Sequence, residues 1–122
     1  MMVLVDTSVW VSHLRYGSSR LEALLLDGSV VCHLFIIGEL ACGRIKNRIE
    51  VLSLLQALPM LEVVDHQELL LFIERNHLMG IGLGFVDVHL LAAGVLTGVT
   101  LWTLDKRLKQ ASAKLDIDFA AA

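Results

Sequence analysis

The sequence predicts an α/β fold with a mainly parallel central sheet of four to five strands flanked by helices. Short β-rich runs alternate with segments of helical periodicity along most of the chain, as they do in βαβ units. The first run, residues 2–5, is apolar throughout, as expected for a strand that is covered on both faces. With 122 residues, of which 56% are hydrophobic and 19% charged, the chain is too apolar for disorder and has the size of one core. We therefore expect a single domain over residues 1–122.

The first half of the chain gives clear signals for helix ends. Thr7 or Ser8 can cap the helix that follows the first strand, and Ser19 and Glu22 have the spacing of a capping box. Pro59 ends a segment in which apolar residues recur at three-residue steps. After the first strand we expect a helix over 9–14, a helix from 19 to the stop at Gly28, a strand over 30–32, and helices over 34–42 and 48–58.

The second half continues the alternation. The segment 85–96 is apolar on all sides, which is typical of a central buried helix. The glycine-rich stretch before it, residues 80–84, follows a helix rather than a strand, so it predicts a loop and not a dinucleotide-binding turn. The remaining expected elements are a strand over 61–64, an amphipathic helix over 66–77, a strand over 99–103, a polar helix over 106–114 and an edge strand over 117–119.

Residues 78–104 carry one formal charge, Asp87, and are long enough to suggest a membrane-spanning helix. The glycines at 80–84 loosen the start of this segment, and Thr97 and Gly98 indicate a helix stop before a β-rich run. A buried helix followed by a buried strand is therefore the better interpretation, and we expect no membrane segment.

The N-terminus and the cysteines both indicate a cytoplasmic protein. The first apolar residues follow no basic stretch and meet Asp6 almost at once, unlike a secretory signal. Cys32 and Cys42 are too few for a disulfide scaffold and lack the spacing of a metal motif. We expect both to be small buried residues in a reducing compartment.

Four acidic residues occur in apolar surroundings, where a charge is costly unless it has a partner. Asp6 and Asp105 follow predicted strands, and the carboxyl ends of parallel strands are where open sheets bind ligands. Glu39 and Asp87 lie in apolar helices that could begin at the same edge. Clustered carboxylates repel one another and are the ligands that Mg²⁺ or Mn²⁺ prefers, so the sequence predicts a divalent metal site.

The overall charge agrees with an acidic site on an otherwise balanced chain. The chain has 13 acidic and 10 basic residues, so nine acids remain when these four are set aside. Basic residues near the same regions of the sequence could hold a phosphate backbone, although they could equally be ordinary solvated surface. These bases are Arg15, Arg44, Lys46, Arg48, Lys106, Arg107 and Lys109.

These residues lie in four stretches that resemble the PIN-domain ribonucleases of the VapC toxin type. The stretches are VDTSVW at 5–10, IGEL at 37–40, FVDVHLLAA at 85–93 and LWTLDKRL at 101–108. They span nearly the whole chain in the order of the family, and no acidic position is missing. The stretch 80–84 is richer in glycine than the family pattern.

The resemblance implies a PIN-like three-layer sandwich and an endoribonuclease that is the toxin of a type II toxin–antitoxin pair. It implies that Asp6, Glu39, Asp87 and Asp105 are the catalytic, metal-binding acids, with support from Thr7 and Thr103. Water activated by Mg²⁺ or Mn²⁺ would attack the RNA phosphodiester. The implied partners are RNA, a VapB-type antitoxin and a second copy in a homodimer. The implied RNA contacts are Arg15, Arg44, Lys46, Lys106 and Arg107.

Other interpretations of the same features stay open. Asp6 and Asp105 could act as helix caps, and Glu39 could be a solvated residue. The five histidines lack metal-ligand spacing, and Trp10 and Trp102 lie in apolar runs, so we treat all of these as structural. A non-catalytic PIN-fold module that binds a protein partner is the alternative function. A phosphoacceptor signalling domain fits less well, because Asp6 has no acidic neighbour.

Overall fold

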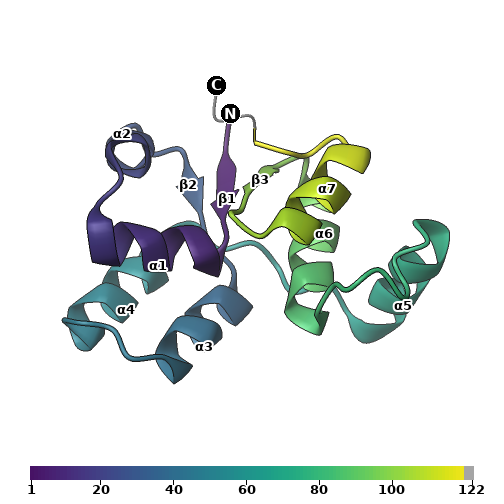
Figure 1. Ribbon diagram of the computed structural model, residues 1–122, viewed down its shortest axis with the longest axis horizontal. Coiled ribbons are helices and arrows are strands. Elements are labelled where there is room, and N and C mark those ends of the chain that lie inside the picture. Colours follow the sequence, from purple (N-terminus) through teal and green to yellow (C-terminus); the bar gives the residue numbers. More distant parts are fainter. Residues whose placement is uncertain (120–122) are drawn as a thin grey trace.

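A three-stranded parallel sheet lies at the centre of the computed structural model, which describes residues 1–119 (Figure 1). Its strands are β1 (Val3–Val5), β2 (Val30–Val31) and β3 (Thr100–Trp102), in the order β2-β1-β3. Val5 pairs with Trp102, so the residues that follow these two strands leave the sheet side by side. This register brings together residues from opposite ends of the sequence.

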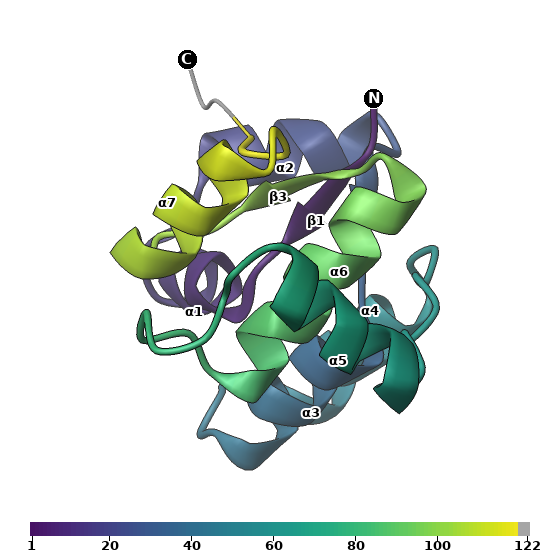
Figure 2. The same ribbon diagram turned by 90° about the vertical axis from the view of Figure 1, so that its right-hand side faces the viewer.

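Helices cover both faces of the sheet, which confirms the α/β class. Figures 1 and 2 show α1 and α2 on one side of the sheet and α6 and α7 on the other, with α5 packed outside α6. The helices are α1 (Thr7–Tyr16), α2 (Ser19–Leu26), α3 (Leu34–Cys42), α4 (Arg48–Gln56), α5 (His66–Arg75), α6 (Phe85–Thr97) and α7 (Lys106–Lys114).

The sheet has fewer strands than the four to five that the sequence predicts. The segments 61–64 and 117–119 form no strands: a single parallel bridge joins Cys32 to Met60, just before the first segment, and another joins Leu101 to Asp118 in the second. Glu62 and Val63 are exposed, so the chain leaves the sheet directly after the first bridge. Short edges of this kind offer few free backbone groups to other chains.

Two predicted helix starts are corrected by the observed caps. Thr7 and Ser8 do not cap α1: the helix already includes both, and Asp6 occupies the N-cap position. The cap of α2 is Ser18 rather than Ser19, because Ser18 has extended backbone and its side chain accepts from the backbone N–H of Leu21. The cap satisfies one of the amides that a helix start leaves without a partner.

The sequence predicts a buried helix over 85–96, and in the structure only the middle of α6 is buried. Residues 88–94 are buried, whereas Phe85 and Leu96 near its two ends are exposed. Within the described part of the chain, no helix is long and apolar enough to cross a membrane.

The two cysteines have different environments. Cys32 is buried, and desolvation raises the pKa of its thiol to about 11, so the thiol stays protonated and unreactive. Cys42 is exposed at the end of α3, so the prediction that both cysteines are buried was wrong. Apolar neighbours in the sequence could not reveal this, because in the last turn of α3 Leu40 is buried whereas Cys42, the final residue of the helix, faces solvent.

Candidate active site

Asp6 is the most buried acidic residue of the site, 6% exposed, at the carboxyl end of β1. Two hydroxyl groups donate to its Oδ2 atom: Thr103 Oγ1 at 2.7 Å and Ser8 Oγ at 2.8 Å. The β1–β3 register places Thr103 beside Asp6, and the first turn of α1 places Ser8 there. The charge of Asp6 is therefore stabilised by two donors, and its Oδ1 has no hydrogen-bond partner among residues 1–119.

The two hydroxyl groups are themselves held by backbone amides. The N–H of Leu104 donates to Ser8 Oγ at 3.0 Å, and the N–H of Asp105 donates to Thr103 Oγ1 at 3.0 Å. Each hydroxyl thus accepts from the loop after β3 and donates to Asp6, so the bonds form a polarised chain. This chain fixes the loop against the start of α1.

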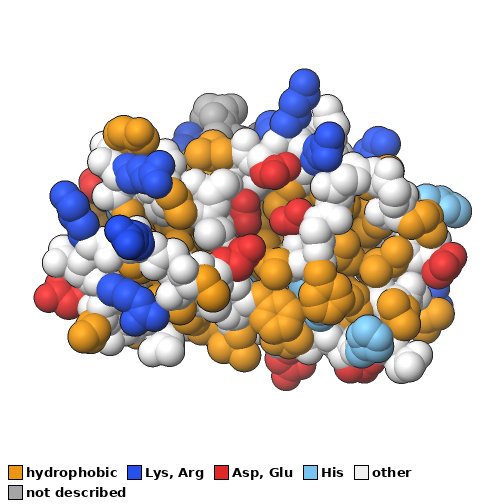
Figure 3. Space-filling model, turned by 60° about the horizontal axis from the view of Figure 1, so that its bottom comes forward, with side chains coloured by type: hydrophobic (Ala, Val, Ile, Leu, Met, Phe, Trp, Pro, Cys, Tyr) orange, Lys and Arg blue, Asp and Glu red, His pale blue; other side chains and the backbone are white. Residues whose placement is uncertain are grey.

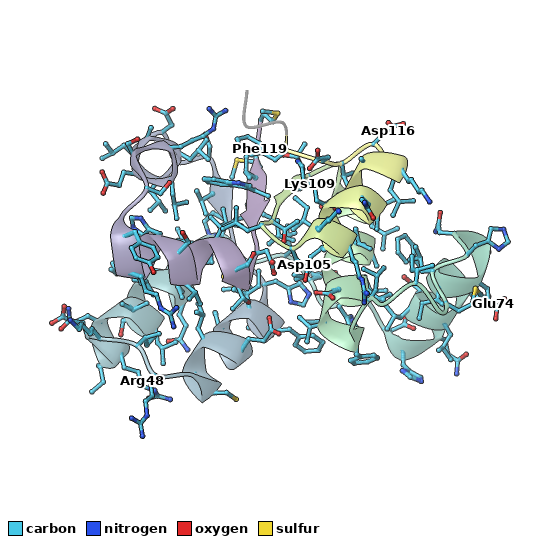
Figure 4. All side chains as sticks on the ribbon, viewed as in Figure 1. Arg48, Glu74, Asp105, Lys109, Asp116 and Phe119 are labelled. Carbon is cyan, nitrogen blue, oxygen red and sulfur yellow. The ribbon has the colours of Figure 1, made fainter. Side chains whose placement is uncertain are left out.

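Asp105 caps α7 with its side chain. Its Oδ1 accepts from the N–H of Leu108 at 3.0 Å, so the alternative role as a helix cap is real. Asp105 is exposed near the middle of the molecule, where the strands end (Figure 4). Its second oxygen remains open to a ligand, so capping and ligand binding are compatible.

Asp87 lies in the first turn of α6, and its Oδ2 accepts from the backbone N–H of Gly84 at 2.9 Å. Burial raises the pKa of Asp87, the Gly84 amide lowers it, and the charges of Asp6 and Asp105 raise it further. The charges of Asp6 and Asp105 therefore act on Asp87 across the edge of the sheet. A divalent cation in that region would relieve this repulsion.

Glu39 stands at the margin of this group. Its side chain is exposed and its Oε1 accepts from Thr7 Oγ1 at 2.6 Å, which links α3 to the residue after Asp6. Figure 3 shows acidic side chains gathered near the middle of one face. As they stand in residues 1–119, however, no three acidic, histidine or cysteine side chains are close enough to form a ready-made metal site. The predicted convergence is therefore looser than four ligands around one point.

The predicted RNA contacts fall into two groups. Arg15, Arg44 and Lys46 line an open cavity of about 610 Å³ between α1, α3 and α4, together with Thr7 and Glu39. On the other side of the acids, Lys106 and Arg107 occupy the first turn of α7, directly after Asp105. The other two bases have local partners: Arg48 donates to the carbonyl of Ala41, and Lys109 forms an ion pair with Asp118.

Arg107 is packed against the glycine-rich loop before α6. Gly82 has a φ of +87°, and a Cβ atom at this position would overlap the guanidinium of Arg107 and come within 2.8 Å of its Cδ. The loop was predicted from sequence, but the reason for a glycine at 82 was not. Glycine suits position 82 because the backbone there is left-handed and because Arg107 occupies the space that a Cβ atom would take.

We expect Gly82→Ala to lower the free energy of unfolding by about 1–3 kcal/mol, because the left-handed backbone is strained and Arg107 must move. Urea unfolding measures this loss. The matched control is Gly80→Ala in the same loop, which has a φ of +70° and nothing within 4 Å of the added Cβ. Equal losses in the two variants would contradict a role for the Arg107 contact.

Two histidines beside the site are buried in an aromatic cluster. The ring of His89 lies 4.7 Å from Phe35 and 4.7 Å from Phe85, both edge to face, and His33 lies 5.1 Å from Phe35. His33 caps α3 by accepting from the N–H of Phe35 at its Nδ1. Burial, followed by the nearby His89, lowers the pKa of His33 to about 4, so it is neutral at physiological pH. These contacts agree with structural histidines.

Ser8 is the site residue that sequence reasoning missed, since it considered Ser8 only as a cap. The available signal was its position two residues after the buried Asp6, at the start of a helix.

Comparisons with known proteins show the family and the fold of the chain. The family model of the PIN domain matches residues 3–114. Two curated relatives from Mycobacterium tuberculosis, strains CDC 1551 / Oshkosh and ATCC 25618 / H37Rv, are both named Ribonuclease VapC32. Each is 49% identical over 98% of this chain and 97% of its own length. The crystal structure of PAE2754 from Pyrobaculum aerophilum has a TM-score of 0.62 and 15% sequence identity, and the match covers 95% of this chain and 96% of that one. At that identity it supports the fold alone.

Proposed function

The chain belongs to the PIN-domain family of VapC-type ribonucleases, and from this we propose that Asp6, Asp87 and Asp105, with Glu39, hold the divalent metal ion with which it cleaves RNA. One observation carries the assignment of the site: Asp6 is buried, its Oδ2 is held by two hydroxyls, and its Oδ1 has no partner among the described residues. A charge kept in this position without a basic partner is costly unless a cation compensates it.

The donor set fits Mg²⁺ or Mn²⁺. All four side chains supply carboxylate oxygens, the ligands of hard cations. Asp87 and Asp105 each use one oxygen for a backbone amide, which orients the carboxylate and leaves the other oxygen available. The pKa of Asp87 is raised mainly by burial and further by the charges of Asp6 and Asp105, and a bound cation would compensate the charge that these effects disfavour.

When bound, the metal ion would lower the pKa of a water for in-line attack on the phosphodiester and stabilise charge on the leaving oxygen. Thr103 and Ser8 orient Asp6 through their hydroxyl groups, and the backbone amides of 104 and 105 hold both hydroxyls in place. Such support of a ligand by its neighbours is typical of metal sites. No side-chain nucleophile is required.

The basic residues on both sides of the acids would hold the RNA backbone. Positive charge lies on two sides of the acids. One side is the open cavity lined by Arg15, Arg44 and Lys46, and the other is the first turn of α7 with Lys106 and Arg107. Contacts of this kind position a strand and make its binding depend on salt.

We also propose, from the family relation, a VapB-type antitoxin partner, a homodimer and a cytoplasmic location. Exposed apolar side chains on α5 and α6, among them Leu71 and Leu96, offer surface that a protein partner would cover.

Calorimetric titration of Mn²⁺ tests the proposed site without knowledge of the RNA target. We expect the natural chain to bind Mn²⁺. The variant Asp87→Asn should bind it at least tenfold more weakly, since even the loss of a group that supports a ligand costs about this much. The control variant Asp116→Asn should bind Mn²⁺ as tightly as the natural chain. Asp116 is an exposed acid beyond the far end of α7 (Figure 4). Equal binding by the protein and Asp87→Asn would exclude Asp87 as a ligand, and no binding by either would favour the non-catalytic interaction module.

The raised pKa of Asp87 also predicts how the substitution Asp87→Asn changes stability with pH. Because the pKa is raised by folding, the folded state binds the proton more tightly, and the free energy of unfolding falls as pH rises between the ordinary and the raised pKa. Asparagine can still accept from Gly84 and carries no charge. We therefore expect Asp87→Asn, without metal, to be at least as stable as the natural chain at pH 7, with the gap closing at acidic pH. Thermal unfolding in EDTA at several pH values checks this. The expectation would be contradicted if the stability of Asp87→Asn relative to that of the natural chain were lower at pH 7 than at pH 4.

A further inference from the structure

Phe85 is exposed although it begins the most buried helix of the fold. Its neighbours along α6 at 88–94 are buried, yet Phe85 itself is 59% exposed. Its ring packs edge to face on the buried His89, which also contacts the rings of Phe35 and His33. The phenyl ring therefore contacts His89 on one side and is open to solvent on the other. The contact restricts the rotamers of Phe85, so less side-chain entropy is lost when a ligand binds.

This ring and the carboxylate of Asp87 belong to the same helical turn. Asp87 Oδ2 accepts from the N–H of Gly84, the residue that precedes Phe85, so one backbone turn positions both side chains. On the face with the acidic group, hydrophobic side chains border the acidic ones directly (Figure 3). A phosphodiester held at the acids through a metal ion would therefore have its ribose and base close to this apolar border.

We propose that Phe85, supported by His89 and Phe35, is a stacking platform for a nucleobase of the RNA next to the phosphate that is cut. This inference rests on the proposed role of the acids as the phosphate site. Every nucleobase has a π-face, so stacking on an aromatic side chain binds single-stranded RNA with little sequence preference. Phe85 is a binding and positioning residue here: it fixes the base and so aligns the neighbouring phosphate with the acids.

The two tryptophans are poorer candidates for this role. Trp10 is buried in the core, and Trp102 lies on β3 with its ring against Phe119. Among the aromatic residues of α3 and α6 that contact His89, Phe85 is the more exposed, and Phe35 is partly buried.

Fluorescence anisotropy without divalent metal tests the platform, because RNA is then not cut and the result does not depend on metal binding. The probes are a short single-stranded oligoadenylate and an abasic ribose-phosphate oligomer of the same length. We expect the natural chain to bind oligoadenylate about 5- to 150-fold more tightly than the abasic oligomer. Phe85→Leu should lose this preference and Phe85→Tyr should keep it.

Salt dependence separates stacking from charge. Phe85→Leu should leave the slope of log affinity against log salt unchanged, because the slope counts phosphate contacts. Arg107→Ala should reduce the slope and keep the preference for oligoadenylate. Leu26→Ala, an exposed apolar change at the last residue of α2, should affect neither.

Three outcomes would overturn the proposal. One is equal binding of the two probes by the natural chain, including no detectable binding of either. A second is an undiminished preference in Phe85→Leu. The third is a change in mass by light scattering in Phe85→Leu with RNA binding intact, which would assign this ring to contacts with a second copy. Loss of Mn²⁺ binding with the base preference intact would instead mean that the metal proposal alone had failed.

Discussion

Asp6→Asn is expected to lower the rate of RNA cleavage by about 10³-fold, corresponding to about 4 kcal/mol of transition-state stabilisation. Asparagine has the shape of aspartate, and its amide oxygen can accept from Thr103 and Ser8 as Oδ2 does. The fold should therefore survive, while the negative charge and one proposed ligand atom are lost. Single-turnover cleavage in saturating Mg²⁺, of any RNA that the natural chain cuts, measures the effect.

Asp116→Asn is the matched control for this change. It makes the same substitution at an exposed acid with a φ of +59°, a conformation that asparagine tolerates well. Its cleavage rate and stability should match those of the natural chain. Retained cleavage by Asp6→Asn, with normal unfolding, would remove Asp6 from the catalytic machinery.

Thr103→Val is expected to lower cleavage by about 10- to 100-fold, as is usual when a group that orients a metal ligand is removed. Valine keeps the shape of threonine but cannot donate to Asp6 Oδ2 or accept from the N–H of Asp105. Leaving that amide without its partner should also lower the free energy of unfolding by about 1–3 kcal/mol. Cleavage rates and urea unfolding together test both parts.

Two further variants separate orientation from general damage to the strand. Thr103→Ser restores the hydroxyl and should recover most of the activity. Thr100→Val makes the same change at the start of β3, where the hydroxyl donates to the carbonyl of Met2 over a longer 3.4 Å. If Thr100→Val lost as much activity as Thr103→Val, the hydroxyl bond to Asp6 would not be the cause.

Features that depend on neighbours along the chain were predicted well. The helices expected at 34–42 and 106–114 coincide with α3 and α7, and the first and last core strands were found within two residues of their ends. Apolar periodicity and stop signals such as Gly98 act within one or two turns, so the sequence carries them directly. The choice of four acids from apolar stretches of sequence has the same origin, and of these only Asp6 is buried in the structure, whereas Glu39 and Asp105 are exposed.

The edges of the sheet and the environment of each acid were not predictable in this way. Whether 61–64 pairs as a strand depends on a distant partner, and only one bridge from Cys32 to Met60 forms. The contact between Gly82 and Arg107 joins two segments whose sequences contain no sign of each other. Cys42 is exposed because of where α3 ends relative to the rest of the fold.

By itself, the sequence of this protein determined the α/β class, the order of the main elements and the four acidic residues that we propose hold the metal ion. Only the tertiary structure decided that Thr103 and Ser8 hold Asp6, that the charges of Asp6 and Asp105 act on Asp87, and that Phe85 in the first turn of the same helix is exposed. The reason is physical. Periodicity and caps are local interactions, whereas hydrogen bonds, repulsion and burial at the site arise between residues up to 97 positions apart, which the parallel register of β1 and β3 brings together.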